Sequence, residues 1–208
     1  MKHLMQAATI LLLLISLPAF AAGDATAGQG KSAICAACHG VDGNSVVPNW
    51  PKIAGQHPDY LERQLDLIKS GLRPVPEMAG IAMGLDKQDM ADLAAYFSTQ
   101  ARKPGAADES NLAEGERIYR AGNATTDVPA CMACHGPAGG GIPLSGYPAL
   151  AGQHSVYTEK MLKGFRGGTT WGAEDESSKV MVGVANRLTD AQISAVASYI
   201  QGLHATSE

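Results

Sequence analysis

One short pattern occurs twice in the sequence and uses every cysteine in the chain. CAACH spans residues 35–39 and CMACH spans residues 131–135, and the chain contains 4 cysteines. In a helical turn, residues i, i+3 and i+4 lie on one face. The two cysteines and the histidine of each copy are therefore expected to point toward one common group.

Several kinds of site use paired cysteines, and the spacing separates them. Structural zinc sites usually place their two pairs about 15–20 residues apart, whereas 92 residues separate Cys38 from Cys131. A thioredoxin-type site is expected in a βαβ setting, and it does not require a histidine after the second cysteine. Cys-x-x-Cys-His is the attachment signature of c-type haem. We predict that Cys35 and Cys38, and then Cys131 and Cys134, form thioethers to two haem c groups; a disulfide or a bound metal is the alternative.

The sequence around the two motifs is duplicated as well. AGQH recurs at residues 54–57 and 151–154, with an offset of 97 residues, close to the offset of 96 at the cysteines. A repeat of this length is large enough to fold as a domain. The predicted organisation is a signal peptide at 1–21, an N-terminal domain at 22–101, a linker at 102–110 and a C-terminal domain at 111–208.

Apolar residues recur at helical spacing in both halves, and no stretch alternates for long enough to predict a strand. The fold class is therefore all-α. Helices are predicted over residues 25–36, 57–70 and 86–100 in the first half, and over 111–122, 155–165 and 189–202 in the second.

The histidines of the two motifs, His39 and His135, are predicted to ligate the haem irons. The second axial ligand must recur in both halves. Met78 and Met181 do so, each in a Gly- and Pro-rich stretch that suggests a loop, and each seven residues before a leucine. We predict that these two methionines complete a Met/His ligand set.

His57 and His154 recur too, at the start of the same helix in each half. A surface or helix-capping role is favoured for them, and bis-histidine ligation is the competing hypothesis. Pro51 and Pro148 are placed to offer a carbonyl oxygen to the ligating histidine of their half, because a carbonyl is the only hydrogen-bonding group of a proline backbone.

Four cationic residues in the predicted helices are candidate partners of the haem propionates, although a solvated surface position is the better expectation for each. They are Arg63, Lys69, Lys160 and Arg166.

The N-terminus predicts export. Lys2 precedes an apolar run that ends at Pro18 and the small residues of Ala19-Phe20-Ala21, a pattern typical of a signal peptide cleaved near Ala21. The formal net charge of −4 excludes a general nucleic-acid binder. The low aromatic content, 5%, suits a core that is partly filled by a macrocycle.

With CAACHGVDGNS, PNWPKIAGQ, DLAAYF and SYIQGLH, the chain resembles cytochrome c4, a family of dihaem c-type cytochromes of the proteobacterial periplasm, over residues 22–204. The resemblance implies two tandem cytochrome c-type haem domains related by pseudo-twofold symmetry. It implies His/Met ligation at both irons. The acidic segment Glu174–Glu176 departs from the pattern.

The resemblance also implies a function, that of an electron carrier without catalytic residues. Electrons would pass from an upstream donor such as a cytochrome bc1 complex to a terminal haem–copper oxidase, with possible peripheral membrane association. Two alternatives remain open: a dihaem peroxidase-type enzyme, which needs one exchangeable iron ligand, and a dedicated haem subunit of a periplasmic dehydrogenase.

Overall fold

The computed structural model describes residues 22–204, and within them regular structure is helical, with only two isolated β-bridges. The predicted signal peptide lies outside the described residues. None of the helices within 22–204 combines the length and the apolar character that a membrane span requires. The all-α prediction is confirmed.

The helices of the first half are α1 (Ala25–Lys31), α2 (Ala33–His39), α3 (Pro58–Lys69), α4 (Pro76–Met83) and α5 (Lys87–Ser98). The second half contains α6 (Leu112–Ala121), α7 (Met132–His135), α8 (Ser155–Arg166), α9 (Glu176–Ala185) and α10 (Asp190–Gly202). Three short 3-10 turns, η1 (Glu109–Asn111), η2 (Ala124–Thr126) and η3 (Pro143–Ser145), complete the described chain.

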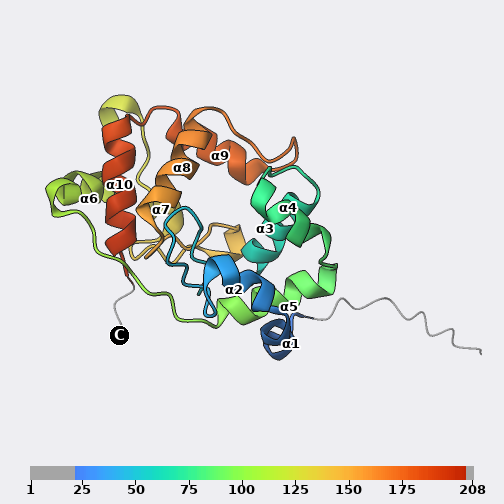
Figure 1. Ribbon diagram of the computed structural model, residues 1–208. Helices are drawn as coiled ribbons and strands as arrows, with labels where there is room; N and C mark the ends of the chain where they lie inside the picture. The colour runs from blue at the N-terminus through green and yellow to red at the C-terminus, as the bar shows by residue number, and fades with distance from the viewer. Residues whose placement is uncertain (1–21, 205–208) are drawn as a thin grey trace, which may run out of the picture.

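The two halves repeat one arrangement, in which the first helix packs against the last: α1 against α5, and α6 against α10 (Figure 1). Each crossing is closed by a glycine. A Cβ at Gly28 would lie 2.0 Å from the Asp92 carbonyl oxygen, and one at Gly115 would lie 2.2 Å from that of Ala195. Because glycine has no side chain, the backbones of the paired helices can come into direct contact there.

The sequence predicted one helix over residues 25–36, and this was wrong in detail. The structure breaks it after Lys31, and α2 then continues through the motif to His39. The cause lies at Ser32, whose N–H and hydroxyl both donate to the Gln29 carbonyl oxygen, at 3.2 and 2.9 Å. These bonds tighten the turn, and α2 starts in a new direction.

The loop predicted around the two methionines was also wrong, because Met78 lies in α4 and Met181 in α9. Pro76 stands at the start of α4, where its fixed φ suits a helix and its missing N–H costs nothing. Asp175 caps α9 by accepting a hydrogen bond from Ser178 N–H at 3.1 Å. These start signals outweigh the glycines inside both segments.

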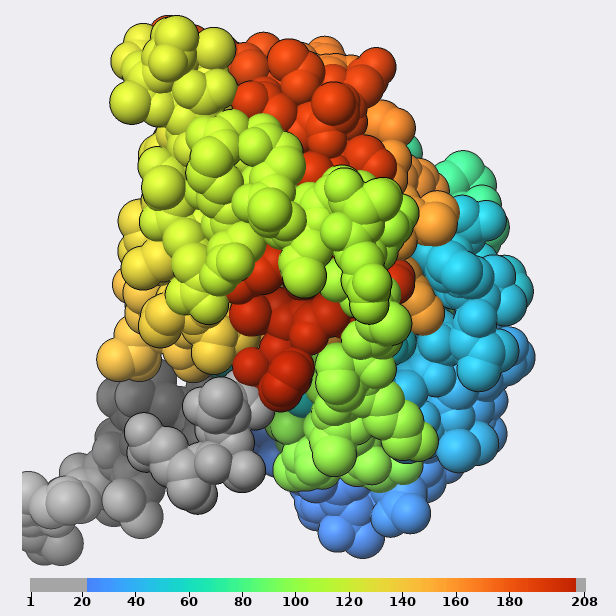
Figure 2. All heavy atoms as spheres, turned by 90° about the vertical axis from the view of Figure 1, so that its left-hand side faces the viewer, coloured from blue at the N-terminus to red at the C-terminus, as the bar shows by residue number. Residues whose placement is uncertain are grey.

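The linker is held against the second half. Gly105 N–H donates to the Gln201 carbonyl oxygen at 2.9 Å, and the Gln201 side chain donates to the Ala106 carbonyl oxygen at 2.7 Å. Asp108 N–H donates to Ser198 Oγ at 2.7 Å. In Figure 2 this yellow-green segment rises from the first half and lies beside the red α10. Residues 105–108 are therefore bonded along α10 of the second half.

Candidate haem sites

Both Cys-x-x-Cys-His motifs lie on short helical turns that end at the histidine. Cys35, Cys38 and His39 all belong to α2. In the second copy, Cys131 is the N-cap of α7 and His135 its last residue. The glycine after each histidine has a positive φ, 79° in the first copy and 77° in the second, a conformation that ends the helix there.

A single contact sets the tautomer of each motif histidine. His39 Nδ1 lies 2.8 Å from the Pro51 carbonyl oxygen, and His135 Nδ1 lies 2.9 Å from that of Pro148. A carbonyl only accepts, so Nδ1 carries the proton and Nε2 keeps its lone pair. The predicted role of the two prolines is confirmed. Each of the two histidine residues is only 7% exposed.

Burial also sets the protonation of these groups. It lowers the pKa of both histidines, although the proline carbonyl partly opposes the shift. The neutral imidazole that a metal requires is therefore the stable form. Burial raises the pKa of the Cys35 thiol, and raises that of Cys131 to about 11. Such thiols are poor thiolate ligands, but their setting suits neutral thioethers.

The repeated methionines are partly buried, and each lies on the helix that packs against the half's long third helix, α4 on α3 and α9 on α8. Met181 also contacts the core of the second half. Met90, which has no repeated counterpart, is 2% exposed within the core of the first half and acts there as a space filler.

His57 and His154 are partly buried, and the capping role expected for them is wrong. Both occupy N-cap positions, but neither side chain makes a capping hydrogen bond. His154 Nε2 instead lies 2.9 Å from the carbonyl oxygen of Ser45 in the other half. His57 Nε2 is close enough to Gly141 that a Cβ there would be only 2.7 Å away. Both imidazoles thus belong to the contact between the halves.

The four cations considered as propionate partners have other contacts or remain at the surface. Arg63 pairs with Asp175 of the other half. Lys69 donates to the Leu85 carbonyl oxygen, and Arg166 donates to that of Leu188. Lys160 is exposed.

The sequence missed two partly buried arginines at the boundary between the halves. Arg73 lies 4.6 Å from the centre of the Trp171 ring and donates to Tyr157 Oη at 2.9 Å. Arg102 donates to three backbone carbonyl oxygens, those of Ala54, Ala149 and Ala151. The composition of the linker gave no signal for Arg102, which reads as an ordinary charged linker residue.

Neither arginine has a carboxylate partner within residues 22–204. Arg102 Nη2 is buried without any hydrogen-bond partner, and burial lowers the pKa of this group to about 10. Buried cations require a countercharge. Each haem carries two propionates, and such carboxylates would supply this countercharge, so the residues at the boundary fit the acidic groups of haem.

The sequence also missed Gln56 and Gln153, which are 6% and 7% exposed. The side chain of each bonds to the backbone of the other half at 2.9 Å. The signal was present: both copies of the repeat preserve the whole of AGQH, including its polar residues.

Comparison with known proteins agrees with this geometry. The profile of the cytochrome c family matches residues 25–101 and again residues 112–204. Cytochrome c4 of Pseudomonas aeruginosa is 49% identical over 196 residues, which cover 93% of this chain and 96% of that protein.

The structure of reduced recombinant cytochrome c4 from Pseudomonas stutzeri superposes with a TM-score of 0.84 at 48% identity, covering 88% of this chain and all of that one. A thiosulfate dehydrogenase electron acceptor of Thiomonas intermedia is 35% identical over 96% of this chain and 90% of its own length. The chain therefore belongs to the cytochrome c4 family, the electron carriers built from two tandem cytochrome c domains with two covalently bound haem c groups.

Proposed function

We propose that this protein is a periplasmic carrier that takes single electrons from a donor such as a cytochrome bc1 complex and delivers them to a terminal haem–copper oxidase. The signal sequence predicted at residues 1–21, with cleavage near Ala21, supports export. The observation that carries the proposal is the duplicated histidine–proline contact, because it prepares two equivalent imidazole ligands in one chain. The domains proposed are residues 22–101 and 111–208, joined by 102–110.

The proposed thioethers are formed by the four motif cysteines, and the proposed axial ligands are one histidine and one methionine in each half. The iron ligands are His39 with Met78, and His135 with Met181. The contact of His154 with Ser45 supports the methionines over bis-histidine ligation, because that imidazole nitrogen is already committed to the other half.

When bound, haem c supplies the one-electron couple of its iron. The chain contributes a fixed environment around it. Pro51 and Pro148 hold the ligating rings in one tautomer, so no proton has to move when the charge of the iron changes. Arg73 and Arg102 offer countercharge to propionates at the boundary between the halves. A site with both axial positions filled suits electron transfer rather than the binding of a substrate.

An optical redox titration of the exported protein tests the proposal. The expected result is two haems per chain, a weak near-red sulfur-to-iron band in the ferric state, and no change in the reduced spectrum under carbon monoxide. Binding of carbon monoxide at one iron would favour the peroxidase alternative instead, because that enzyme needs an exchangeable sixth ligand.

A second candidate is an electron acceptor of a thiosulfate-oxidising dehydrogenase. The relative from Thiomonas intermedia, aligned over nearly the whole chain, favours it. The two candidates differ in the donor. Rapid mixing of the oxidised protein with a thiosulfate dehydrogenase and thiosulfate would reduce both haems within the enzyme's turnover time only if this candidate holds. Co-purification with a larger partner would indicate a dedicated subunit.

A further inference from the structure

Two buried glutamines bridge the halves in the same manner. Gln153 Nε2 donates to the Lys52 carbonyl oxygen, and Gln153 Oε1 accepts from Lys52 N–H, both at 2.9 Å. Gln56 makes the same pair of contacts with Ala149, again at 2.9 Å. Because only one orientation of each amide satisfies both bonds, the position of the acceptor oxygen is defined.

The N–H that Gln153 accepts belongs to the same peptide group as the carbonyl that holds His39. That group joins Pro51 to Lys52: its oxygen accepts from His39 Nδ1 at 2.8 Å, and its N–H donates to Gln153 Oε1. A continuous chain of hydrogen bonds therefore runs from the imidazole of the first half to a side chain of the second.

An equivalent chain of hydrogen bonds starts from the imidazole of the second half and ends at a side chain of the first. The peptide group between Pro148 and Ala149 accepts from His135 Nδ1 at 2.9 Å and donates to Gln56 Oε1 at 2.9 Å. Each imidazole is thus connected, through one peptide group, to a glutamine of the opposite half.

We infer that Gln56 and Gln153 are positioning residues that tune the haem of the other half: Gln153 acts on the haem held by His39, and Gln56 on the haem held by His135. The inference rests on the proposed function, since it takes these two histidines as iron ligands. The reduction potential of each haem would then depend partly on a residue of the other domain, about a hundred positions away in the sequence.

The direction of the effect follows from peptide polarisation. A hydrogen bond accepted from the N–H draws electron density toward the carbonyl oxygen, and consecutive bonds of this kind strengthen one another. A stronger acceptor at Nδ1–H makes the imidazole a more basic ligand. A more basic ligand favours ferric iron, so each glutamine lowers the potential of the haem to which it is connected.

The test uses the complete dihaem protein and two reciprocal variants, Gln153→Leu and Gln56→Leu. Haem methyl resonances, followed by NMR through a redox titration, report the midpoint potential of each haem separately. Gln153→Leu is expected to raise the potential of the His39 haem more than that of the His135 haem, and Gln56→Leu to do the opposite. In the reduced, diamagnetic protein, the Nδ1 proton of the affected histidine is expected to move upfield, as its hydrogen bond weakens.

Two controls separate this effect from loosening of the interface. Gln153→Glu retains an oxygen that accepts from Lys52 N–H, so the potential of the His39 haem should not rise. Arg63→Gln removes the ion pair with Asp175 between the halves without touching either peptide group, and it should raise neither potential. An equal rise of both potentials in any of these variants would overturn the inference.

Failure of the inference differs from failure of the proposed function. If the leucine variants retain the sulfur-to-iron band but neither haem shifts in the crossed pattern, the hydrogen-bond chains do not tune the haems. If the wild-type spectrum shows that the motif histidines do not ligate iron, the proposed function itself is wrong.

Discussion

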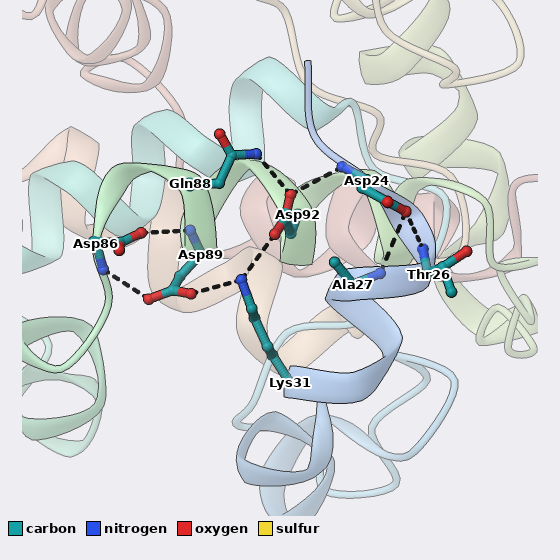
Figure 3. A network of polar contacts seen from close by, with 8 residues as sticks. All are labelled: Asp24, Thr26, Ala27, Lys31, Asp86, Gln88, Asp89 and Asp92. Atoms are coloured by element: carbon teal, nitrogen blue, oxygen red, sulfur yellow. Dashed lines mark hydrogen bonds and ion pairs between the residues drawn. The ribbon is translucent and has the colours of Figure 1, made fainter. Parts of the chain in front are cut away.

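In both halves the first helix crosses the last at a glycine, but different chemistry holds the crossing together. In the first half, the carboxylate of Asp92 on α5 accepts hydrogen bonds from Asp24 N–H at 2.9 Å, Lys31 Nζ at 2.8 Å and Gln88 Nε2 at 2.8 Å (Figure 3). In the second half the equivalent position is Ala195, which is buried and apolar. One geometry is therefore stabilised by charge in one half and by apolar packing in the other.

The second half also has the larger cluster of buried apolar side chains. Four buried residues form the cluster of the first half: Leu61, Leu93, Ala94 and Phe97. The cluster of the second half has 14 buried residues, among them Tyr119, Phe165, Trp171 and Tyr199, and it takes in Leu67 from the first half. The second half thus fills more of its interior with side chains, and we expect the first half to depend more on its haem for a core.

The largest expected effect comes from removing one haem at a time. The pair Cys35→Ala and Cys38→Ala should halve the haem content and leave the first half without protection from hydrogen exchange, because its cluster is too small to persist. The pair Cys131→Ala and Cys134→Ala should also halve the haem content but leave measurable protection in α6 and α10. Equal loss of protection in both would contradict the comparison of the cores.

The next effect tests whether the two halves share one ligand set. Met78→Leu and Met181→Leu should each remove about half of the near-red sulfur-to-iron band and lower the potential of one haem, because a soft thioether ligand raises it. Absorbance of the oxidised protein and an optical titration measure both changes. Met83→Leu is the matched control, since Met83 is 65% exposed and should leave band and potentials unchanged.

Substitution at the helix crossings should affect both halves alike. Gly28→Ala and Gly115→Ala each place a Cβ against a backbone carbonyl oxygen, at 2.0 and 2.2 Å, and overpacking of this kind costs about 1–3 kcal/mol. Denaturant titration measures the loss. Gly30→Ala in the same helix meets nothing within 4 Å and should not destabilise; if it costs as much, close approach is not the cause.

The smallest expected effect is a difference in acid sensitivity. The hydrogen bond from Asp24 N–H, together with those from Lys31 and Gln88, lowers the pKa of Asp92 from 3.8 to about 2. A carboxyl whose pKa is lower in the folded state stabilises above its unfolded pKa, and this contribution disappears as the pH falls through the folded pKa. Between about pH 4 and pH 2, the first half should therefore lose stability before the second.

Hydrogen exchange resolved by segment, measured across that pH range, checks the order. Asp92→Asn should remove most of the acid dependence in α1 and α5. Asp190→Asn is the control in the second half, because Asp190 pairs with Arg166 but its side chain is 77% exposed. An unchanged acid profile for Asp92→Asn would assign the sensitivity to other groups.

The sequence was sufficient for features that depend on local spacing. Two copies of Cys-x-x-Cys-His indicated the haem sites, and the repeated prolines indicated the carbonyl contacts of His39 and His135, which the structure contains. The ligand methionines stay a prediction, although their local structure is helix rather than loop. Pro76 and Asp175 were available as helix start signals, but glycines within the segments concealed them.

Contacts between the halves were not predictable in the same way. A polar residue such as Gln56 or His154 reads as solvated, because its partner lies about a hundred residues away and no local pattern marks it. The partly buried Arg102 is a similar case, since its partners are backbone carbonyls of both halves. Only the preservation of AGQH in both copies pointed to a shared role.

The reciprocal glutamine bridges have a consequence for how the two haems can diverge. In a dimer of identical chains, one substitution at such a position would change both bridges at once, because the same substitution is present in both subunits. Here the partners are fused in tandem, so Gln56 and Gln153 are separate positions that mutate independently. Fusion in tandem therefore keeps a symmetric architecture but allows the potentials of the two haems to differ.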